Sequence, residues 1–344
     1  MKRLLIITQK VDEQDDLLGF FVAWIREFSR LWDSVTVITL GVGVHTLPSN
    51  VRILSLGKER GSSKFSRAIS FGAHCIREIP RHDVVFAHMS PVFAIAAAPL
   101  TKLFQKKLIL WYLHRSATIK LKLAIALADK LVTADTQSLT IRNSKIVAVG
   151  HGIDVQRFSN PQRVAPANRP IRILSVGRVS PIKGFETLLR AVHVLRKNGF
   201  VCEIRIVGAP VMKGDAEYAG SLHALIQNLE ISDIVTMIGF VPYADMPKQY
   251  AWADVVAGCT PPGGIDKVLL EAMAAGCIVM TSNGVMGAHL TPYADQLVFP
   301  AGDSERLAQL LNSLHEYDEL SRAMVVAAQR YTVESVVKNI SALV

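Results

Sequence analysis

A glycine-rich loop that runs into a helix, Gly263 to Gly276, constrains the fold of this chain more than any other stretch. The apolar run Asp254–Gly258 precedes it and the apolar run Cys277–Thr281 follows it. Strand, loop, helix and strand in this order form a βαβ unit with parallel strands. The amides and the dipole at a helix start bind anions, and glycines let the backbone come close to a phosphate. Glu271, farther along the helix, could accept hydrogen bonds from ribose hydroxyls, so the stretch predicts a nucleotide site.

A second stretch supports this interpretation. Ile171–Gly177 has the pattern of a buried strand, and a helix is expected over Phe185–Lys197. Between them lie Arg178 and Lys183, at the carboxyl end of a strand, where open α/β sheets bind ligands. An arginine fork and a lysine point charge suit a diphosphate. Two ordinary surface cations in a solvated turn are the alternative, and the loop downstream makes us favour the phosphate site.

These two stretches resemble the retaining GT-B glycosyltransferases, in particular glycosyltransferase family 4. The family carries a G-R-x-x-x-x-K-G segment, here Gly177 to Gly184, and a segment ending in L-L-E-A-M-A-x-G, here Leu269 to Gly276. The resemblance extends over nearly the whole chain and includes the turn at Gly152 to Asp154 with Phe158. It implies an α/β protein of the GT-B class, with two Rossmann-like parallel-sheet domains facing across a cleft and a C-terminal helix that returns to the first domain.

The resemblance also implies a function and a site. The chain would move a sugar from a nucleotide-diphosphate sugar to an acceptor hydroxyl with retention, without a metal or a cofactor, in the synthesis of a cell-envelope glycolipid or polysaccharide. The catalytic residues implied are His114, Arg178 and Lys183. The donor-binding residues implied are Gly19, Arg178, Lys183, Val241, Gly263, Gly264, Ile265, Asp266, Lys267, Val268 and Glu271.

One departure from the family pattern bears on catalysis. The first glutamate of the family's E-x7-E pair would stand at position 263, where this chain has Gly263. Its loss is compatible with a changed donor preference, with replacement by Asp266 or a backbone carbonyl, or with an inactive protein. Asp266 lies three residues too late to substitute simply, and we expect it to cap the helix. A catalytically inactive GT-B protein that binds nucleotide sugar therefore remains an alternative, as does a nucleotide-sugar epimerase of the same fold.

Alternating strands and helices predict two domains. Residues 1–160 would form the acceptor domain, 161–170 a Pro- and Asn-rich linker, 171–325 the donor domain, and 326–344 the returning helix, which starts near Thr332. Seven strand candidates precede the linker and six follow it, the last at Gln296–Phe299.

Composition agrees with a folded α/β protein, since 50% of the 344 residues are hydrophobic and 19% are charged. The four cysteines are scattered without metal-like spacing and are expected to be small core residues in a reducing compartment. Lys2–Thr8 has the pattern of a first strand rather than a signal peptide, and apolar runs such as Val92–Leu100 are too short to span a membrane. We therefore expect a cytoplasmic protein.

Positive charge is concentrated in the first half. Residues 1–165 hold 23 Lys and Arg against 12 Asp and Glu, whereas the remainder holds 15 against 17. The asymmetry suggests an anionic partner, which could be nucleic acid, a lipid headgroup or an acidic substrate, or else a role in solubility. No recognised nucleic-acid motif accompanies the charge, so we name the anionic inner face of a membrane as a partner to test. One basic series comprises Lys102, Lys106, Lys107, Arg115, Lys120 and Lys122.

The segment Ser63–Ile79 could contribute to such a surface. Its helical periodicity places apolar residues on one face, namely Phe65, Ile69, Gly72, Ile76 and Ile79. We favour the simpler interpretation, in which this face packs on the sheet as in an ordinary amphipathic helix.

Other polar residues of the first half have weaker claims to function. His88 ends a predicted strand and is a weaker catalytic candidate than His114, and His151 is interpreted as a turn residue. The acidic cluster of Asp12, Glu13, Asp15 and Asp16 superficially suggests a metal site, but we interpret it as a solvated loop.

Overall fold

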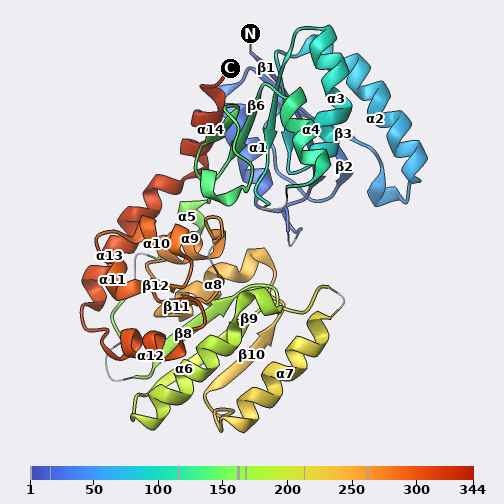
Figure 1. The fold of residues 1–344 in the computed structure, drawn as a ribbon. Coiled ribbons are helices and arrows are strands. Elements are labelled where there is room, and N and C mark those ends of the chain that lie inside the picture. The colour runs from blue at the N-terminus through green and yellow to red at the C-terminus, as the bar shows by residue number, and fades with distance from the viewer. Residues whose placement is uncertain are drawn as a thin grey trace. The chain divides into compact units, whose positions relative to one another are not determined.

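Runs of buried apolar residues form the strands of two separate parallel sheets (Figure 1). A computed structural model of the protein describes residues 2–15, 17–114, 117–160, 163–166, 169–212, 214–261 and 263–344. The chain divides into two units, one of Met1–Gly152 with Thr332–Val344 and one of Ile153–Tyr331. Some residues singled out above lie outside the described ranges: Asp16, Arg115, and Pro161, Gln162, Ala167 and Asn168 of the predicted linker.

The first unit is built on a seven-stranded sheet in the order β3-β2-β1-β4-β5-β6-β7, in which all described pairs are parallel. Its central strands are buried on both faces, as expected where helices cover both sides. The strands are β1 (Arg3–Val11), β2 (Ser34–Val42), β3 (Val51–Ser55), β4 (Val84–His88), β5 (Lys107–Trp111), β6 (Lys130–Thr133) and β7 (Ile146–Ala148). They agree with the seven strands predicted.

Three helices cover one face of this sheet: α2 (Lys64–Glu78), α3 (Pro91–Leu103) and α4 (Ile119–Leu127). They share one core with alternate residues of the central strands, such as Leu5, Ile7, Val85 and Leu108. Helix α1 (Phe21–Leu31) covers the other face, where Phe28 packs on Phe86 of β4.

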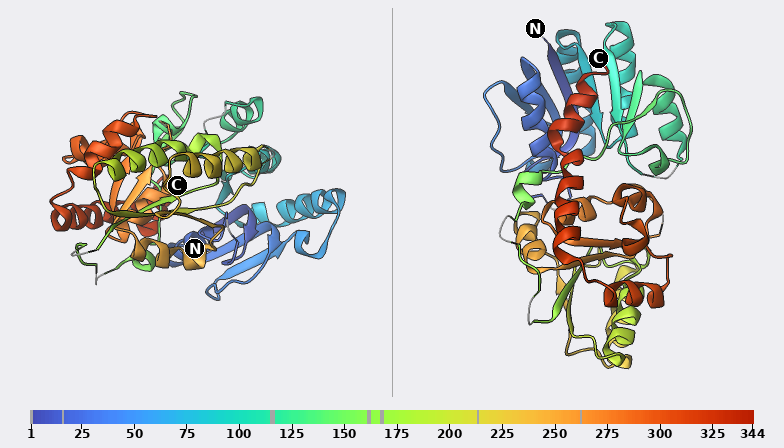
Figure 2. Two further views of the ribbon diagram at one scale, coloured as in Figure 1. Left: turned by 90° about the horizontal axis from the view of Figure 1, so that it is seen from below. Right: turned by 90° about the vertical axis from the view of Figure 1, so that its left-hand side faces the viewer.

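The last helix, α14 (Val333–Ser341), belongs to the first unit and packs beside α1 (Figure 1 and Figure 2). Its buried side consists of valine and isoleucine residues, including Val336 and Ile340. Trp32 Nε1 donates a hydrogen bond to Ser341 Oγ at 3.1 Å, and Thr332 caps the helix by accepting from the amide of Ser335. The chain end is therefore held on the unit that contains the chain start.

The second unit is built on a five-stranded parallel sheet in the order β10-β9-β8-β11-β12. Its strands are β8 (Ile171–Val176), β9 (Cys202–Val207), β10 (Val235–Gly239), β11 (Val255–Gly258) and β12 (Ile278–Thr281). Its helices are α5 (Val155–Phe158), α6 (Phe185–Lys197), α7 (Asp215–Asn228), α8 (Met246–Trp252), α9 (Lys267–Ala274), α10 (Gly284–Gly287), α11 (Ala294–Leu297), α12 (Ser304–Asn312) and α13 (Tyr317–Ala328).

Short 3₁₀ turns complete the described elements. They are η1 (Lys58–Arg60), η2 (Ile79–Arg81), η3 (Thr136–Ser138), η4 (Pro181–Lys183), η5 (Tyr243–Asp245), η6 (Ala288–Leu290) and η7 (Gln329–Tyr331).

Two arginines fasten the predicted linker to the second unit, which begins before it at Ile153. Arg163 donates from its guanidinium to the backbone oxygens of Tyr250, Ala253 and Ala275. Arg169 forms a two-pronged ion pair with the buried Asp254, with N–O distances of 2.6 and 2.7 Å. The segment before β8 is thus fastened to the second unit.

The sixth strand predicted for the second half is wrong. Residues 294–297 form α11, and only Val298 makes an isolated bridge to Thr281 of β12. Phe299 is buried and Val298 is partly buried, but the two form no ladder, and an apolar run of this length does not distinguish a strand from a buried loop.

The packing predicted for the Ser63–Ile79 helix is also wrong. Phe65, Ile69 and Ile76 are exposed, whereas Ile79 alone of the predicted stripe is fully buried. The helix packs instead through its other side, where Phe71 stacks on Phe93 of α3 with ring centroids 6.0 Å apart. Cys75 and Glu78 lie on the same side and are buried. The apolar face predicted for the core therefore lies on the surface.

None of the described helices is long and apolar enough to cross a lipid bilayer.

Candidate functional site

Two glycines shape the carboxyl end of β8. Gly177 and Gly208 both have positive φ angles, 154° and 142°, which glycine adopts without strain. A Cβ at Gly208 would lie 1.9 Å from the oxygen of Gly177, and a Cβ at Gly177 would lie 2.6 Å from Cε of Lys183. The bare backbone therefore lets the β8 and β9 ends approach and leaves room for the lysine side chain.

Lys183 points from this turn to the start of α9. Its ammonium lies 3.3 Å from Oδ2 of Asp266, and about a fifth of each side chain is exposed. Gly184 turns the chain into α6 with φ of 59°, and a Cβ there would lie 2.7 Å from the oxygen of Cys259. The structure thus joins two of the predicted site segments, the Arg178–Lys183 turn and the glycine-rich loop.

Asp266 caps α9, as expected from the sequence. Its Oδ1 accepts a hydrogen bond from the amide of Val268 at 3.2 Å. The Val268 amide, predicted to face a diphosphate, therefore has a side-chain acceptor in this structure. Asp266 accordingly places one carboxylate between a helix start and a lysine, where the sequence predicts phosphate oxygens.

Arg178 pairs with a different acid. Its Nε lies 3.5 Å from Oδ2 of Asp215, the first residue of α7, and the arginine side chain is 44% exposed. Hydrogen bonds from the amides of Met212 and Val211, together with the Arg178 charge, hold the pKa of Asp215 below its ordinary value. Each of the two predicted phosphate-binding cations thus holds its own carboxylate.

Glu271 is buried and has two partners. The hydroxyl of Tyr250 donates to Oε2 at 2.9 Å, and the ammonium of Lys267 lies 3.2 Å from Oε1. Burial, followed by the nearby Glu271 charge, raises the pKa of Tyr250 well above its ordinary value, so the tyrosine is a stable donor. The carboxylate predicted to hold ribose is therefore fixed in orientation and exposed for only 2% of its residue surface.

The turn after β10 reaches the same cluster. Val241 is half-buried and precedes η5, where the Tyr243 ring lies 4.3 Å from the ammonium of Lys267. Burial and the Glu271 charge also raise the pKa of Tyr243. The turn that holds Val241, a predicted donor-binding residue, and the predicted ribose carboxylate Glu271 are thus brought together through Tyr243 and Lys267.

Asn283 holds the glycine-rich loop in place. Its Oδ1 accepts from the amide of Gly263 at 3.3 Å, and its Nδ2 donates to the oxygen of Gly264 at 2.8 Å. The same Oδ1 accepts from the amide of Val285 in the turn after β12. Ile265 is buried beside this loop, so the loop is fixed by both a polar and an apolar anchor.

Four of these residues were missed by sequence reasoning: Asp215, Tyr243, Tyr250 and Asn283. Asn283 had a local signal, because an asparagine between a strand and a glycine is typical of a cap. Tyr243 and Tyr250 had no local sequence signal, because they belong to the site only through tertiary contacts around Glu271.

Gly19 follows β1 in the first unit and leaves no room for a side chain. Its amide donates to the oxygen of Asp15 at 2.9 Å, and a Cβ would lie 2.6 Å from that oxygen. The loop before it is ion-paired: Lys10 lies 3.1 Å from Asp12 and 2.8 Å from Asp15. No cluster of three or more His, Cys, Asp and Glu side chains suited to a metal ion occurs within the described ranges.

His114 follows β5 in the first unit and is exposed. Its ring meets Tyr112 edge-on, with centroids 5.4 Å apart. An exposed imidazole beyond the carboxyl end of a strand is accessible to a ligand, as its predicted role requires.

His88, by contrast, is a core residue. Its ring stacks on Phe21 at 3.6 Å and Nδ1 lies 3.0 Å from Oγ1 of Thr8. Burial lowers the pKa of His88 to about 3, so the ring is neutral at physiological pH. His151 is likewise buried, edge-on to Trp111.

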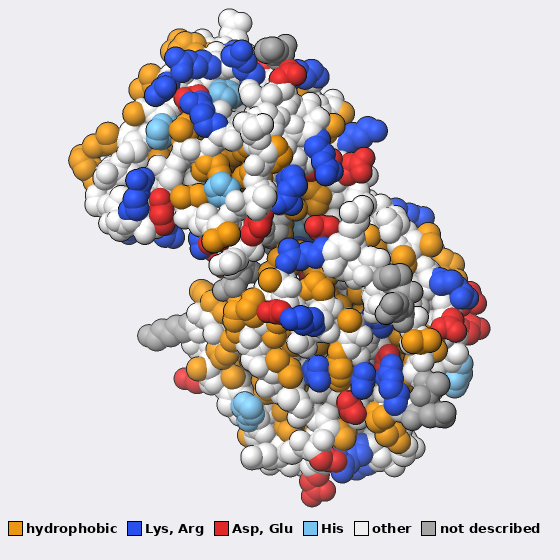
Figure 3. Space-filling model, turned by 180° about the vertical axis from the view of Figure 1, so that it is seen from behind, with side chains coloured by type: hydrophobic (Ala, Val, Ile, Leu, Met, Phe, Trp, Pro, Cys, Tyr) orange, Lys and Arg blue, Asp and Glu red, His pale blue; other side chains and the backbone are white. Residues whose placement is uncertain are grey.

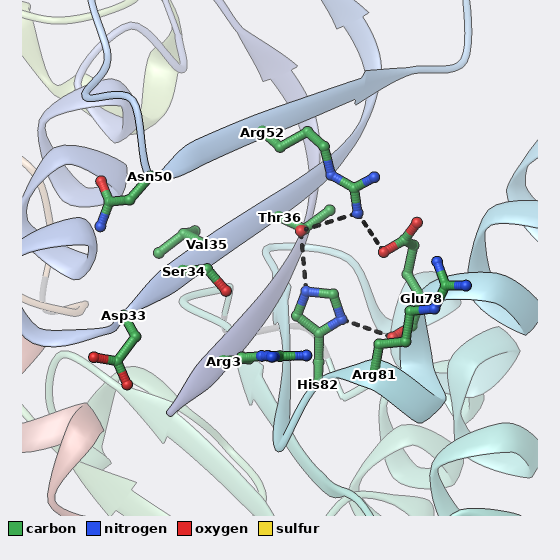
Figure 4. A pocket seen from close by; sticks show the side chains of 10 residues that line it. All are labelled: Arg3, Asp33, Ser34, Val35, Thr36, Asn50, Arg52, Glu78, Arg81 and His82. Atoms are coloured by element: carbon green, nitrogen blue, oxygen red, sulfur yellow. Dashed lines mark hydrogen bonds and ion pairs between the residues drawn. The ribbon is translucent and has the colours of Figure 1, made fainter. Parts of the chain in front are cut away.

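A pocket of about 320 Å³ opens at the other end of the first sheet (Figure 4). Arg3, Ser34 and Arg52 line it from the amino ends of β1, β2 and β3. Arg52 pairs there with the buried Glu78, and Nε2 of His82 lies 3.0 Å from Oγ1 of Thr36. Ligands of open α/β sheets bind at the carboxyl ends of the strands, so this pocket is not the predicted donor site.

Relatives of this chain are glycosyltransferases. The chain is 30% identical to WcaL of Escherichia coli (strain K12), named as a colanic acid biosynthesis glycosyltransferase, over 206 residues that are 58% of this chain and 49% of the relative. It is 30% identical to the amylovoran biosynthesis glycosyltransferase AmsK of Erwinia amylovora over 198 residues, or 56% and 47% of the two chains. The chain thus spans about half the length of these relatives.

Solved structures share the fold over the whole chain. Anabaena Alr3699/HepE in complex with UDP superposes with a TM-score of 0.77 at 18% identity, covering 100% of this chain and 99% of the other. The sucrose-phosphate synthase of Thermosynechococcus elongatus superposes with a TM-score of 0.77 at 17% identity, covering 100% and 98%. These similarities and the two parallel sheets confirm the predicted GT-B fold.

A match to a family sequence profile identifies the family of this chain. The profile of the family described as Glycosyl transferases group 1 matches residues 156–331, which include the Arg178–Lys183 turn, the glycine-rich loop and Glu271. That segment makes up half of the chain. The protein therefore belongs to the glycosyl transferases group 1 family.

Proposed function

We propose that this protein is a retaining glycosyltransferase that moves a sugar from a nucleotide-diphosphate sugar to an acceptor hydroxyl. One observation carries the proposal most directly: the Lys183 ammonium meets the capped start of α9, 3.3 Å from Asp266. A cation and a helix start at one place form an anion site of the kind that a diphosphate needs. The names of the relatives, which refer to colanic acid and amylovoran biosynthesis, support a role in cell-envelope polysaccharide or glycolipid synthesis.

The donor would bind the second unit. Arg178 and Lys183 would exchange their carboxylate partners for the oxygens of the diphosphate, with the backbone of Gly263, Gly264 and Ile265 beside it. Glu271 would accept hydrogen bonds from the ribose, and the backbone of Val241 would contact the base. HepE has been solved with UDP and with UDP-glucose, which supports a nucleotide sugar as the ligand of this fold.

Lys267 would hold Glu271 in place before the donor binds. Its ammonium lies 4.3 Å from the centre of the Tyr243 ring and 3.2 Å from Oε1 of Glu271, so it pairs with the buried carboxylate in the absence of ligand. A ribose hydroxyl would take over part of this hydrogen bonding when the donor binds. The Tyr250 hydroxyl remains on the other carboxylate oxygen and keeps its orientation.

Catalysis would come from charge stabilisation at the leaving group. As the glycosidic bond lengthens, negative charge builds on the diphosphate, and fixed cations and amides stabilise that charge more strongly than the ground state. The acceptor hydroxyl would attack from the face that the diphosphate leaves. We assign no protein nucleophile and no metal to this scheme. The resemblance to family 4 implies that His114 contacts the donor sugar and that the Gly19 loop contacts the donor phosphate.

The proposal also gives the protein a place in the cell. The acceptor would be a glycan or a lipid-linked glycan, and the protein would work in the cytoplasm at the inner face of the membrane. The excess of positive charge in residues 1–165 supports attraction to anionic lipid.

A donor screen tests the proposal. The melting temperature is measured with a panel of nucleotide sugars and with the matching free nucleotides, because a ligand that binds only the native state stabilises it. The donor that binds is then incubated with the protein, and released nucleoside diphosphate and the anomeric configuration of the product are measured. We expect nucleotides with one kind of base to raise the melting temperature, and we expect the sugar to be transferred with its anomeric configuration retained. Stabilisation without any release would favour a non-catalytic binding protein, and no stabilisation by any nucleotide would overturn the proposal.

A further inference from the structure

The outward face of α2 carries large apolar side chains that no described residue of the first unit covers. Phe65, Ile69 and Ile76 are 76%, 58% and 63% exposed. They recur at intervals of four and seven residues, which places them on one side of the helix. The opposite side of α2 is the one packed on the core, through Phe71, Cys75 and Glu78.

The neighbouring helices extend this surface. On α3 the exposed apolar residues are Val92 and Leu103, and on α4 they are Ile119, which is 85% exposed, and Leu123. Helix α3 packs against both α2 and α4, and all three lie on the same core (Figure 1). Their outward faces therefore adjoin, and we call them together the α2–α4 surface.

Positive charge surrounds these apolar side chains. Exposed cations lie at both ends of α2, at Lys64 and Arg77, and on α3 and α4, at Lys102, Lys120 and Lys122. Figure 3 shows the molecule from behind, and on that face of the first unit Lys and Arg (blue), Asp and Glu (red) and hydrophobic side chains (orange) are all present.

Acidic residues are almost absent from this part of the sequence. Residues 61–128 contain ten Lys and Arg but only two acidic residues, Glu78 and Asp83. Glu78 is 1% exposed and pairs with Arg52, and Asp83 accepts a hydrogen bond from the amide of Arg3 at the amino end of the sheet. The α2–α4 surface thus combines apolar and cationic side chains with no exposed acid on the three helices.

We propose that the α2–α4 surface is the site at which this protein docks on an anionic lipid bilayer. Helices that lie in the membrane interface carry large apolar side chains on one face and Lys and Arg on the polar face. Phe65, Ile69, Ile76 and Ile119 enter the boundary between headgroups and acyl chains, while the cations contact lipid phosphates. This inference deepens the proposed function, since it names the surface that would bring the enzyme to a lipid-linked acceptor.

Flotation with lipid vesicles tests the docking. The full-length protein is mixed with vesicles of phosphatidylcholine alone or of phosphatidylcholine with phosphatidylglycerol, at low and high salt. We expect flotation with the anionic vesicles, weakened at high salt because salt screens surface charge. Absence of flotation with anionic vesicles, or equal flotation with neutral ones, would overturn the proposal.

Two variants locate the surface. Phe65→Ser/Ile69→Ser/Ile76→Ser should lose most of the bound fraction, and Lys120→Gln/Lys122→Gln should reduce partitioning by about fivefold for each cation removed. The matched control is Val201→Ser/Val326→Ser, which removes two side chains of the second unit that are each 67% exposed. It should float like the unmodified protein.

Flotation of the triple variant at the level of the unmodified protein would contradict the assignment of the α2–α4 surface. Loss of flotation in the control would contradict it as well.

A second readout separates this inference from the proposed function. The stabilisation by nucleotide is measured for every variant, and we expect it unchanged because the substituted side chains are exposed and lie outside the donor site. Loss of flotation with nucleotide binding retained supports the α2–α4 surface. If the unmodified protein floats but binds no nucleotide, the proposed function fails and the docking surface stands.

Discussion

The ammonium of Lys183 lies 3.3 Å from the carboxylate of Asp266, although the two residues are 83 positions apart in the chain. Asp266 also caps α9, so the ion pair connects the turn after β8 to the helix that carries Glu271. A diphosphate that binds Lys183 must compete with this carboxylate. The unliganded site therefore holds an internal anion where the donor's anion is proposed to bind.

Asp266→Asn should tighten the binding of nucleoside diphosphate. Asparagine caps a helix about as well as aspartate, so the start of α9 is preserved while the competing charge is removed. We expect the Kd for UDP or GDP, whichever stabilises the protein, to fall about two- to fivefold, the size of a partly exposed ion pair. Calorimetric titration measures it. An unchanged or raised Kd would show that Asp266 does not compete with the ligand.

Lys183→Ala and Arg178→Ala should each abolish most transfer. Both side chains are partly exposed, so the fold should be retained, whereas the leaving diphosphate loses a charge partner. We expect kcat/KM to fall by about a hundredfold or more, as when one fixed donor to a developing charge is removed. Initial rates of diphosphate release provide the measurement. Lys197→Ala and Arg190→Ala on the exposed side of α6 are matched controls and should be neutral. Rates at the unmodified level in both site variants would remove the phosphate assignment.

Glu271→Ala should weaken nucleotide binding about tenfold or more, because a hydrogen bond to a charged group contributes about 1.5–3 kcal/mol. Tyr250→Phe tests whether orientation of the carboxylate matters. It removes the 2.9 Å hydrogen bond to Oε2 and leaves the charge, so it should cost less affinity than Glu271→Ala. Calorimetry of the two variants compares them. Unaltered affinity in Glu271→Ala would exclude the ribose role.

Asn283→Ala should loosen the glycine-rich loop. Asn283 is 2% exposed and its side chain bonds to Gly263, Gly264 and Val285, so its removal leaves partly buried backbone groups of the loop and the buried amide of Val285 unpaired. We expect a loss of about 1–3 kcal/mol in the free energy of unfolding, measured by urea titration, and a weaker affinity for the donor. Asn283→Asp keeps the acceptor and should retain more stability than alanine does. Equal stability of the unmodified protein and both variants would show that contacts other than those of Asn283 hold the loop.

His88 should make the protein less stable in acid. Its pKa is about 3 in the folded protein and near 6.5 when unfolded, so between these values the unfolded chain binds one more proton. Stability is therefore lost as the pH falls from about 6.5 towards 3, with a slope of up to about 1.4 kcal/mol per pH unit from this residue. His88→Phe, which can stack on Phe21, should flatten the dependence measured by denaturant unfolding. The same slope in both proteins would mean that the ring is protonated in the fold.

The succession of strands β1 to β12 along the chain and the turn that follows β8 could be predicted because they depend on local patterns. Buried parallel strands have continuous apolar runs, and Gly177, Arg178, Lys183 and Gly184 lie within one turn. The cap at Asp266 was predicted for the same reason, since a cap requires only the residues beside it.

The misplaced elements depend on contacts that a local pattern does not contain. The stripe of Phe65, Ile69 and Ile76 has the period of a packed helix face, but the packed face is chosen by the fit of Phe71 to Phe93. Likewise Tyr250 joins the site only because α8 lies beside Glu271, and the Asp215 pair depends on where α7 begins. Helical periodicity gives the faces of a helix and leaves open which one is buried.

The most direct test of the central claim is a crystal structure of this protein with the nucleoside diphosphate that binds it. The account predicts that a phosphate oxygen lies within hydrogen-bonding distance of the Lys183 ammonium and the start of α9, that Lys183 has left Asp266, and that a ribose hydroxyl donates to Glu271. A diphosphate bound elsewhere, with Lys183 still paired to Asp266, would contradict it.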